Sequence, residues 1–220
     1  MPSKLKKLWI FLWESNSIWS WVANVIIAFV LIKFIIYPGI GLALSTEYPI
    51  VAVVSESMDH HVLYQGKTNR YWLCDESFAE KKSVDFDRYW SICKDWYEQN
   101  TNVTKAEFEK FPFKNGFRRG DIMIIRGKKP KDIQVGNIIV FKSVRPYPII
   151  HRVVKKDIRD GKYYFTTKGD HNPNTVGDIG EASIAEERVL GIASIKIPFL
   201  GYIKIWFVDI MGKLFGIKVN

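Results

Sequence analysis

The stretch GNIIVFKSVRPYPIIHRVV, residues 136–154, contains two apolar runs, Ile138–Phe141 and Ile149–Val154, joined by a polar connection with two prolines. Short runs rich in β-branched and aromatic residues, bounded by turn residues, indicate strands. Four more runs share this pattern: Val51–Val54, Ile122–Ile125, Tyr163–Thr167 and Val189–Ile195. We therefore predict a mainly β protein whose strands form an antiparallel sandwich or partial barrel.

Residues 62–116 have a different pattern and predict an inserted α-helical subdomain. Ser77-Phe-Ala-Glu80 and Thr104-Lys-Ala-Glu107 both have the form of a capping box, which marks a helix start. One further group of apolar residues falls at helical spacing, as expected for an ordinary packing face: Phe86, Trp90, Cys93 and Tyr97. No chemistry is assigned to this insert.

Both cysteines of the chain, Cys74 and Cys93, lie in the insert. Two cysteines exclude a disulfide-dense scaffold and a four-cysteine zinc module. A disulfide and a pair of free thiols both remain open, because the sequence does not show how far apart the two residues lie. Asn102-Val-Thr104 matches the N-glycosylation pattern, although short motifs also match by chance.

The segment from Ile18 to Leu44 contains one charged residue, Lys33, and is long enough to cross the roughly 30 Å of hydrocarbon in a bilayer. A core helix of a soluble domain seldom runs so far without charge. A cleaved signal peptide would have a shorter apolar region, about 7–15 residues, followed by a small-x-small cleavage site. We therefore predict an uncleaved transmembrane anchor.

The distribution of charge predicts how the anchor is oriented. Lys4, Lys6 and Lys7 precede the span, and positive residues beside a first span tend to stay in the cytoplasm. The net charge of +9 resides in residues 118–220, but long domains cross the membrane largely regardless of their charge. We expect a single-pass protein of the cell membrane or the endoplasmic-reticulum membrane, with a cytoplasmic N-terminus and an extracytoplasmic or lumenal domain.

The C-terminal residues 198–220 are apolar but are interrupted by Lys204, Asp209 and Lys213. This pattern favours a segment lying in the membrane interface, with a second span as the alternative.

Ser57, in Ser55-Glu-Ser57-Met58, directly follows a predicted strand and is a candidate nucleophile. A serine hydroxyl needs a neighbouring base, and His151 lies within the strand Ile149–Val154. Asp170 and Asp178 follow in one loop, so serine, histidine and aspartate could form a nucleophile, its general base and an orienting carboxylate. Residue types alone are weak evidence, because most chains of this length contain all three.

Five ordered segments add specificity. Ser-x-Ser-Met after an N-terminal span is followed by Arg119-Gly-Asp-Ile-Met-Ile124, Gly136-Asn-Ile-Ile-Val-Phe141, His151-Arg-Val-Val154 and Thr167-Lys-Gly-Asp170. This order resembles the type I signal peptidases of the archaeal and endoplasmic-reticulum branch. Bacterial members have a lysine base where this chain has His151. The resemblance covers about residues 51–58 and 117–195.

The resemblance implies a role for each matching residue. Ser57 would attack the peptide carbonyl, and His151 would act as the general base. Asp178 would orient His151, with Asp170 as the alternative. Ser55 would help the Ser57 backbone N–H stabilise the oxyanion, and Met58 would lie beside it in the substrate-binding region.

Three departures from the family pattern stand out. His60 takes the place of the usual proline, and His171 follows Gly-Asp where asparagine is common. Asp178 lies two residues further from Asp170 than is usual, so its assignment needs a gap. His60 and His61 are also alternative bases, although nothing in the sequence fixes their geometry.

The implied protein is a membrane-bound serine endopeptidase that removes N-terminal signal peptides from secreted and membrane preproteins. We expect no cofactor and no metal, with signal peptides, membrane lipids and the protein-translocation machinery as partners. The alternatives are a non-catalytic anchored binding protein, nucleic-acid binding by the basic half, and a self-cleaving repressor protease, which would use a lysine base. The predicted parts are a tail (1–17), the anchor (18–45), a catalytic β-domain (46–61 and 117–197), the insert (62–116) and an interfacial segment (198–220).

Overall fold

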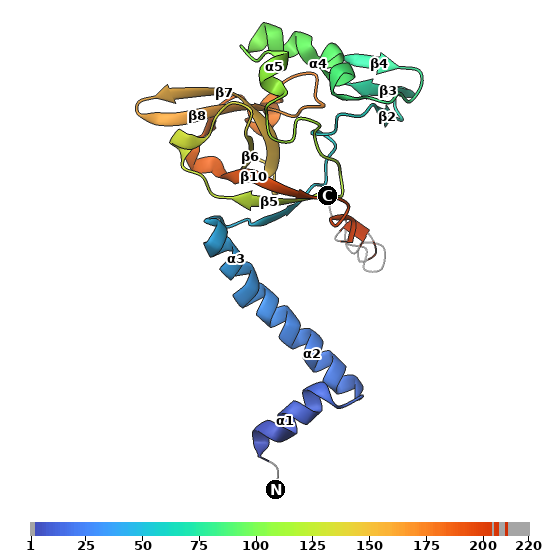
Figure 1. Ribbon diagram of the computed structural model, residues 1–220, viewed down its shortest axis with the longest axis vertical. Coiled ribbons are helices and arrows are strands. Elements are labelled where there is room, and N and C mark those ends of the chain that lie inside the picture. Colours follow the sequence, from blue (N-terminus) through green and yellow to red (C-terminus); the bar gives the residue numbers. More distant parts are fainter. Residues whose placement is uncertain (1–2, 204, 207–209, 211–220) are drawn as a thin grey trace. The chain divides into compact units, whose positions relative to one another are not determined.

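The computed structural model describes residues 3–203, 205, 206 and 210 (Figure 1). The chain divides into two compact units, Met1–Pro49 and Ile50–Asn220. Each unit has its own internal contacts.

The first unit is helical. A short helix, α1 (Lys4–Trp13), precedes one continuous helix made of α2 (Ile18–Leu31), a π-helical segment (Ile32–Ile36) and α3 (Tyr37–Leu44). The side chains of Ser20 and Asn24 donate to the Leu12 carbonyl oxygen and tie α2 to α1.

The continuous helix Ile18–Leu44 has 27 residues and a mean hydropathy of 2.4. At 1.5 Å per residue it is about 40 Å long, which exceeds the hydrocarbon thickness of a bilayer. Its π-helical turn lies just before Pro38, whose ring nitrogen has no hydrogen to donate to the preceding turn. The predicted apolar helix is present, and its length and composition suit a membrane span.

The second unit is built on a seven-stranded antiparallel sheet with the order β1-β5-β10-β6-β7-β8-β9. The strands are β1 (Ile50–Ala52), β5 (Ile122–Arg126), β6 (Ile138–Phe141), β7 (Ile149–Arg159), β8 (Lys162–Lys168), β9 (Ile184–Ala185) and β10 (Val189–Ile197). All six predicted runs form strands, so the mainly β prediction is confirmed.

The sheet curls on itself (Figure 1). Register shifts in β7 and β10 mark bulges, which increase local twist and bend a strand. Two clusters of buried side chains fill the interior. One surrounds Met123, Ile125 and Val140, and the other surrounds Phe141, Val153 and Phe165.

Short 3-10 turns connect the elements of this sheet. They span Pro130–Asp132, Gly177–Ile179 and Glu186–Arg188. The second of these lies in the long connection between β8 and β9.

The insert contains a small sheet as well as helices. Strands β2 (Leu63–Gln65), β3 (Arg70–Leu73) and β4 (Glu76–Phe78) pair antiparallel, and α4 (Phe86–Asn100) and α5 (Lys105–Phe108) follow. The prediction of a helix start at Ser77–Glu80 was wrong, because Phe78 pairs with Tyr71 across β3 and β4 and is buried. Asp85 caps α4 instead, while the capping box at Thr104–Glu107 is confirmed at the start of α5.

Most of the predicted face of α4 packs inward: Trp90, Cys93 and Tyr97 are buried, whereas Phe86 is half-buried. Tyr89, which was not predicted, is buried as well, and all four aromatic rings contact the ring of Phe108. A disulfide joins Cys74, after β3, to Cys93 in the middle of α4. This bond answers the question that the sequence left open, and it ties the small sheet to the helix.

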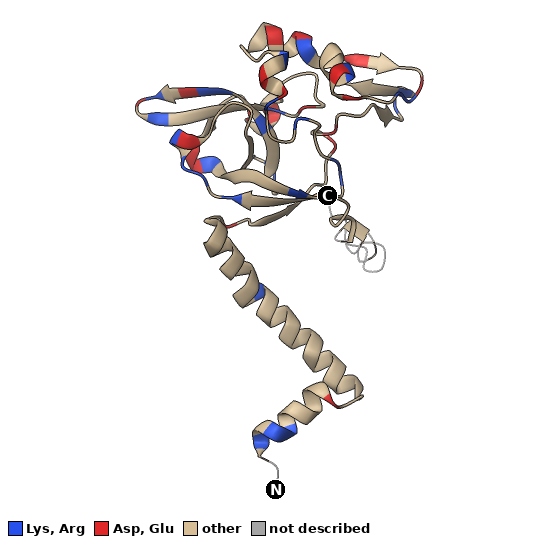
Figure 2. Ribbon diagram, in the orientation of Figure 1, with Lys and Arg blue, Asp and Glu red and all other residues tan. Residues whose placement is uncertain are grey.

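The basic residues of the C-terminal half gather in part on the β7–β8 hairpin (Figure 2), with Lys155, Lys156, Arg159 and Lys162 among them. After β10, the Gly201 N–H donates to the Gly120 carbonyl oxygen. Most of the predicted interfacial segment 198–220 lies outside the described residues.

Phe108 is the centre of the insert's aromatic packing and is fully buried. We expect Phe108→Ala to lower the free energy of unfolding by about 3–5 kcal/mol, because it removes the transfer free energy of the ring and leaves a cavity. Chemical denaturation of the detergent-solubilised chain measures this change. Tyr64→Ala, at a position 56% exposed in the same insert, should change stability by less than about 0.5 kcal/mol. Equal losses in both variants would contradict a core centred on Phe108.

Candidate active site

Ser57 and His151 are in hydrogen-bonding contact although 94 positions separate them in the chain. Ser57 lies in the turn after β1, and its Oγ is 2.9 Å from Nε2 of His151, which extends from β7. His151 is 4% exposed, whereas Ser57 is half-buried at the edge of a hollow. The structure therefore brings the predicted nucleophile and the predicted base together.

The carboxylate that contacts His151 belongs to Glu181, a residue that the sequence reasoning missed. Its Oε2 lies 2.5 Å from Nδ1 of His151 and accepts the Thr167 hydroxyl at 3.0 Å, while its Oε1 accepts the Val176 N–H. Glu181 is fully buried. A carboxylate at Nδ1 favours the tautomer with its proton there, which leaves the Nε2 lone pair free to accept the Ser57 proton.

Neither predicted aspartate takes this place. Asp178 is exposed in the 3-10 turn Gly177–Ile179, and Asp170 is buried in an ion pair with Arg152. After that turn the chain returns beside β8, where the Thr167 N–H donates to the Glu181 carbonyl oxygen. This return places Glu181, and not Asp178, beside His151. The unusual spacing after Asp170 was the one sequence signal that the third position had moved.

Ser55 and Met58 have different surroundings. The Ser55 hydroxyl is 3.1 Å from the Ser57 hydroxyl, within reach of the same reaction centre. Met58 is 1% exposed and packs in the β-domain core beside Val53 and Phe117. Met58 therefore packs the turn that carries Ser57 against the core. Its burial does not favour the predicted contact with substrate.

A hollow of about 310 Å³ opens beside Ser57 and His151. Apolar side chains form most of its lining, among them Val54, Tyr147, Ile149, Val176 and Ile179. Strand β1 is at the end of the sheet order and pairs with β5 on one side. The other edge of β1 can therefore accept an extended peptide as an added strand next to Ser57.

The turn that carries Ser57 is locked to the turn after β8. The His171 N–H donates to the Ser57 carbonyl oxygen at 2.9 Å, and Nδ1 of His171 donates to the Asp59 carbonyl oxygen at 3.0 Å. Gly169 lies so close that a Cβ there would be 2.8 Å from the Ser57 carbonyl oxygen and 3.0 Å from Nε2 of His151. Glycine at 169 is thus required by the close approach of the two turns.

Asp170 is the polar centre of this second turn. Its carboxylate accepts Nε and Nη2 of Arg152 at 2.9 and 2.7 Å, and Nε2 of His60 at 3.0 Å. Burial opposes ionisation of Asp170, but the Arg152 guanidinium and the His60 hydrogen bond outweigh it and hold the pKa of this carboxyl well below its usual range. Arg152 is saturated as well, since its remaining donors reach the carbonyl oxygens of Pro112, Phe113 and Gly136.

The insert covers this turn. The Tyr89 hydroxyl donates to the Asp170 carbonyl oxygen at 2.9 Å, and the Cys74 N–H donates to the His171 carbonyl oxygen at 3.0 Å. The Tyr89 ring also stacks on His60, with ring centroids 3.6 Å apart. Cys74, which is part of the disulfide, is therefore linked to the main chain of Ser57 through a single residue, His171.

The other predicted base candidates are occupied elsewhere. His60 contacts Asp170, and His61 contacts the Asp59 carboxylate at 2.6 Å and a guanidinium nitrogen of Arg118 at 2.7 Å. Lys168 is fully buried, and burial lowers the pKa of its ammonium to about 8. Its Nζ lies over the rings of Trp96 and Tyr97 and donates to the Gly169 carbonyl oxygen.

No family model matches the chain. Among curated proteins, it is 31% identical over 94 residues to the signal peptidase complex catalytic subunit SEC11 of Yarrowia lipolytica, covering 40% of this chain and 54% of the relative. It is 28% identical over 119 residues to the Schizosaccharomyces pombe subunit, covering 42% and 61%. It is 34% identical over 94 residues to human SEC11C, covering 40% and 49%.

The chain thus spans about half the length of the curated relatives it matches. These relatives are catalytic subunits of the signal peptidase complex, so the resemblance to signal peptidases predicted from the ordered motifs is confirmed.

Burial lowers the pKa of both His60 and His171 below the ordinary value of 6.5. Below pH 6.5 the unfolded chain therefore takes up more protons than the folded one, and stability falls as the pH drops toward the folded pKa values. We expect the urea midpoint of the solubilised protein to fall between pH 7.5 and 5.5, and to fall less in His60→Gln, whose amide can still donate to Asp170. Gln65→Ala, at an exposed position with no titratable group, should keep the wild-type pH dependence. The same pH dependence in wild type and His60→Gln would contradict this account.

Proposed function

We propose that this homologue of signal peptidase catalytic subunits is a membrane-anchored serine endopeptidase that cleaves N-terminal signal peptides from secreted and membrane preproteins. The proposal rests on the chain of contacts from Ser57 Oγ through His151 to Glu181, at the edge of an apolar hollow. A buried imidazole between a hydroxyl and a carboxylate is the arrangement that activates serine for acyl transfer.

Acylation begins when Ser57 Oγ attacks the scissile carbonyl carbon and its proton passes to Nε2 of His151. The negative charge of Glu181 stabilises the imidazolium that forms, and the fixed Nδ1 contact keeps the ring aimed at Ser57. The Ser57 backbone N–H and the Ser55 hydroxyl stabilise the oxyanion; a single such donor is commonly worth about 10²–10³ in rate. His151 then protonates the leaving amine as the C–N bond breaks.

Deacylation uses the same groups. A water molecule gives a proton to His151 while its oxygen attacks the acyl carbon, and the bond to Ser57 Oγ breaks as the proton passes back to that oxygen. The products are the released signal peptide and the mature chain, and the residues return to their starting protonation states.

The lining of the hollow supports the substrate class. Branched apolar side chains and a volume of about 310 Å³ suit an extended peptide with small residues at the positions before the cleaved bond. The free edge of β1 would bind the main chain of the peptide. The cleaved bond would then be the one whose preceding substrate side chains are small enough to fit the hollow beside Ser57.

We propose a membrane location in which the lysines before α2 stay in the cytoplasm and the β-domain lies outside or in a lumen. The Cys74–Cys93 disulfide supports this side of the membrane, because disulfides persist in oxidising compartments. The homologues are subunits of a signal peptidase complex, and we propose comparable partners here, together with membrane lipids and the translocation machinery.

Substitutions in the catalytic residues test the proposal directly. Ser57→Ala and His151→Ala should each lower kcat for cleavage of a preprotein by at least about 10⁴, and Glu181→Gln by about 10²–10⁴, because the histidine loses the charge that stabilises its cationic form. Asp178→Asn is the matched control and should cleave at the wild-type rate.

Full cleavage by Ser57→Ala would overturn the assignment of the nucleophile, whereas preprotein binding without cleavage by the wild type would favour a non-catalytic binding protein. A loss in Asp178→Asn without a loss in Glu181→Gln would overturn the assignment of Glu181.

The insert's contact with the second turn gives a separate prediction. Tyr89→Phe removes the hydroxyl that holds the Asp170 carbonyl oxygen, which costs about one hydrogen bond and should lower kcat about five- to tenfold. KM should change little, because Tyr89 is not among the residues that line the hollow. Tyr64→Phe, an exposed tyrosine of the same insert, should match wild type. An increase in KM with unchanged kcat would contradict the positioning role.

A further inference from the structure

The chain contains one Asn-x-Ser/Thr sequence with a residue other than proline in the middle, Asn102-Val103-Thr104. The structure places it in the loop between α4 and α5 of the insert. Loops of this kind, on the surface of a domain outside the cytoplasm, are where N-linked glycans are attached.

The loop holds Asn102 outward. Val103 is 6% exposed and packs into the insert core, and its N–H donates to the Thr101 hydroxyl. Thr104 caps α5 through the Glu107 carboxylate and backbone. Asn102, between these two fixed residues, is exposed, and its carboxamide has no hydrogen-bond partner in the described part of the chain.

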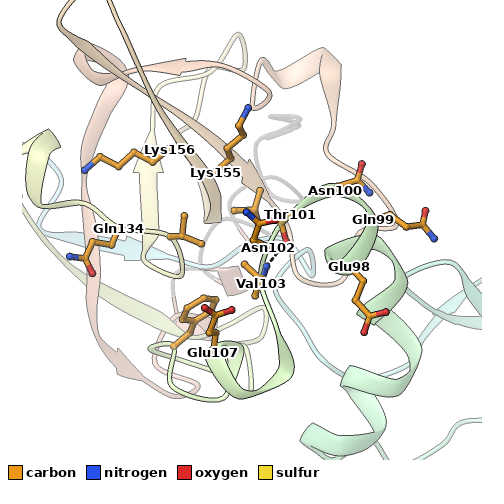
Figure 3. A pocket seen from close by; sticks show the side chains of 13 residues that line it. Glu98, Gln99, Asn100, Thr101, Asn102, Val103, Glu107, Gln134, Lys155 and Lys156 are labelled. Atoms are coloured by element: carbon orange, nitrogen blue, oxygen red, sulfur yellow. Dashed lines mark hydrogen bonds between the residues drawn. The ribbon is translucent and has the colours of Figure 1, made fainter.

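Beside Asn102 lies a hollow of about 810 Å³ between the insert loop and β7 (Figure 3). Its lining combines hydrogen-bonding side chains, including Glu98, Gln99, Gln134 and Lys155, with the apolar side chains of Val103 and Phe111. Sugars present hydroxyl groups at their edges and C–H groups on their faces. A lining that offers both polar and apolar groups therefore matches a sugar that is attached at Asn102.

The disulfide between Cys74 and Cys93 is an independent observation. It lies in the same insert and indicates an oxidising compartment, the side of the membrane on which an oligosaccharide would be transferred. The sequence motif, the exposed amide and the disulfide all belong to the insert, and the hollow lies where the insert meets β7.

We propose that Asn102 carries an N-linked glycan whose first sugar rests in this hollow. In the transfer, a bond forms between the side-chain amide nitrogen of Asn102 and the anomeric carbon of a lipid-linked oligosaccharide phosphate. The bond from that carbon to the phosphate oxygen breaks, the phosphate leaves on the lipid, and the amide nitrogen loses one proton. The proposal rests on the proposed function for the orientation of the domain and for nothing else.

The glycan would not block catalysis. The hollow beside Asn102 and the hollow beside Ser57 share no lining residue. Asn102→Gln should therefore cleave preproteins at the wild-type rate.

The test is expression of the full chain in microsomes competent for N-glycosylation, followed by gel mobility with and without peptide N-glycosidase. Wild type should show one enzyme-sensitive increase in mass, and Asn102→Gln and Thr104→Val should show none. Asn100→Gln, at the last residue of α4, should be modified like wild type. Absence of the shift in wild type, or its persistence in Asn102→Gln, would overturn the proposal.

A second, engineered glycosylation acceptor distinguishes the glycan proposal from the proposed orientation of the domain. Asp160→Asn with Lys162→Thr creates an acceptor in the β7–β8 turn, where Asp160 and Gly161 both have positive φ and asparagine-glycine is favoured. Modification of this turn without modification at Asn102 would overturn the glycan proposal and leave the orientation intact. Modification at neither site would overturn both, while preprotein cleavage in the same microsomes reports on the proposed function separately.

Hydrogen exchange tests whether the first sugar occupies the hollow. Hydrogen exchange of the loop residues 98–104 should be slower in the glycosylated protein than after peptide N-glycosidase treatment, because the sugar covers the loop and the lining of the hollow. Equal exchange in a fully glycosylated sample would show that the glycan does not occupy the hollow.

Discussion

The ion pair between Arg152 and Asp170 is the interaction on which the rest of the site depends. Both side chains are fully buried, and burying two charges costs more than their attraction returns unless every donor and acceptor is satisfied. Here Arg152 binds both carboxylate oxygens and three carbonyl oxygens, and Asp170 also accepts His60. Arg152 follows His151 directly on β7, so the same strand that positions the proposed base also anchors the turn next to the proposed nucleophile.

The insert contributes contacts to this arrangement and so helps to hold the turn after β8 in place. Tyr89 and Cys74 reach the main chain of Asp170 and His171, and Tyr89 stacks on His60. His60 and His171 account for two of the three departures from the pattern of the family that the sequence resembles. Both departures belong to the contacts that join the insert, the second turn and the turn of Ser57. The disulfide closes the insert over them and limits how far these contacts can move apart.

The proposed catalytic geometry is assembled from three distant segments. Ser57 follows β1, His151 is part of β7, and Glu181 lies in the connection between β8 and β9. Glu181 supplies the same charge as an aspartate from a side chain one methylene longer. This extra reach, together with the longer loop after Asp170, lets the carboxylate meet Nδ1 of His151 while Asp178 faces solvent.

The sequence by itself determined the apolar helix Ile18–Leu44, the six main strands and the capping box at Thr104, and it singled out Ser57 and His151 as the candidate nucleophile and base. Each of these is encoded locally, by hydrophobic period, turn residues or an ordered motif. The tertiary structure alone decided that Ser77 begins no helix, that Cys74 pairs with Cys93, that Met58 belongs to the core, and that Glu181 meets His151. Such outcomes depend on which distant segments come together. A loop of fifteen residues between β8 and β9 can bring any of several carboxylates to one imidazole, and only the folded chain selects among them.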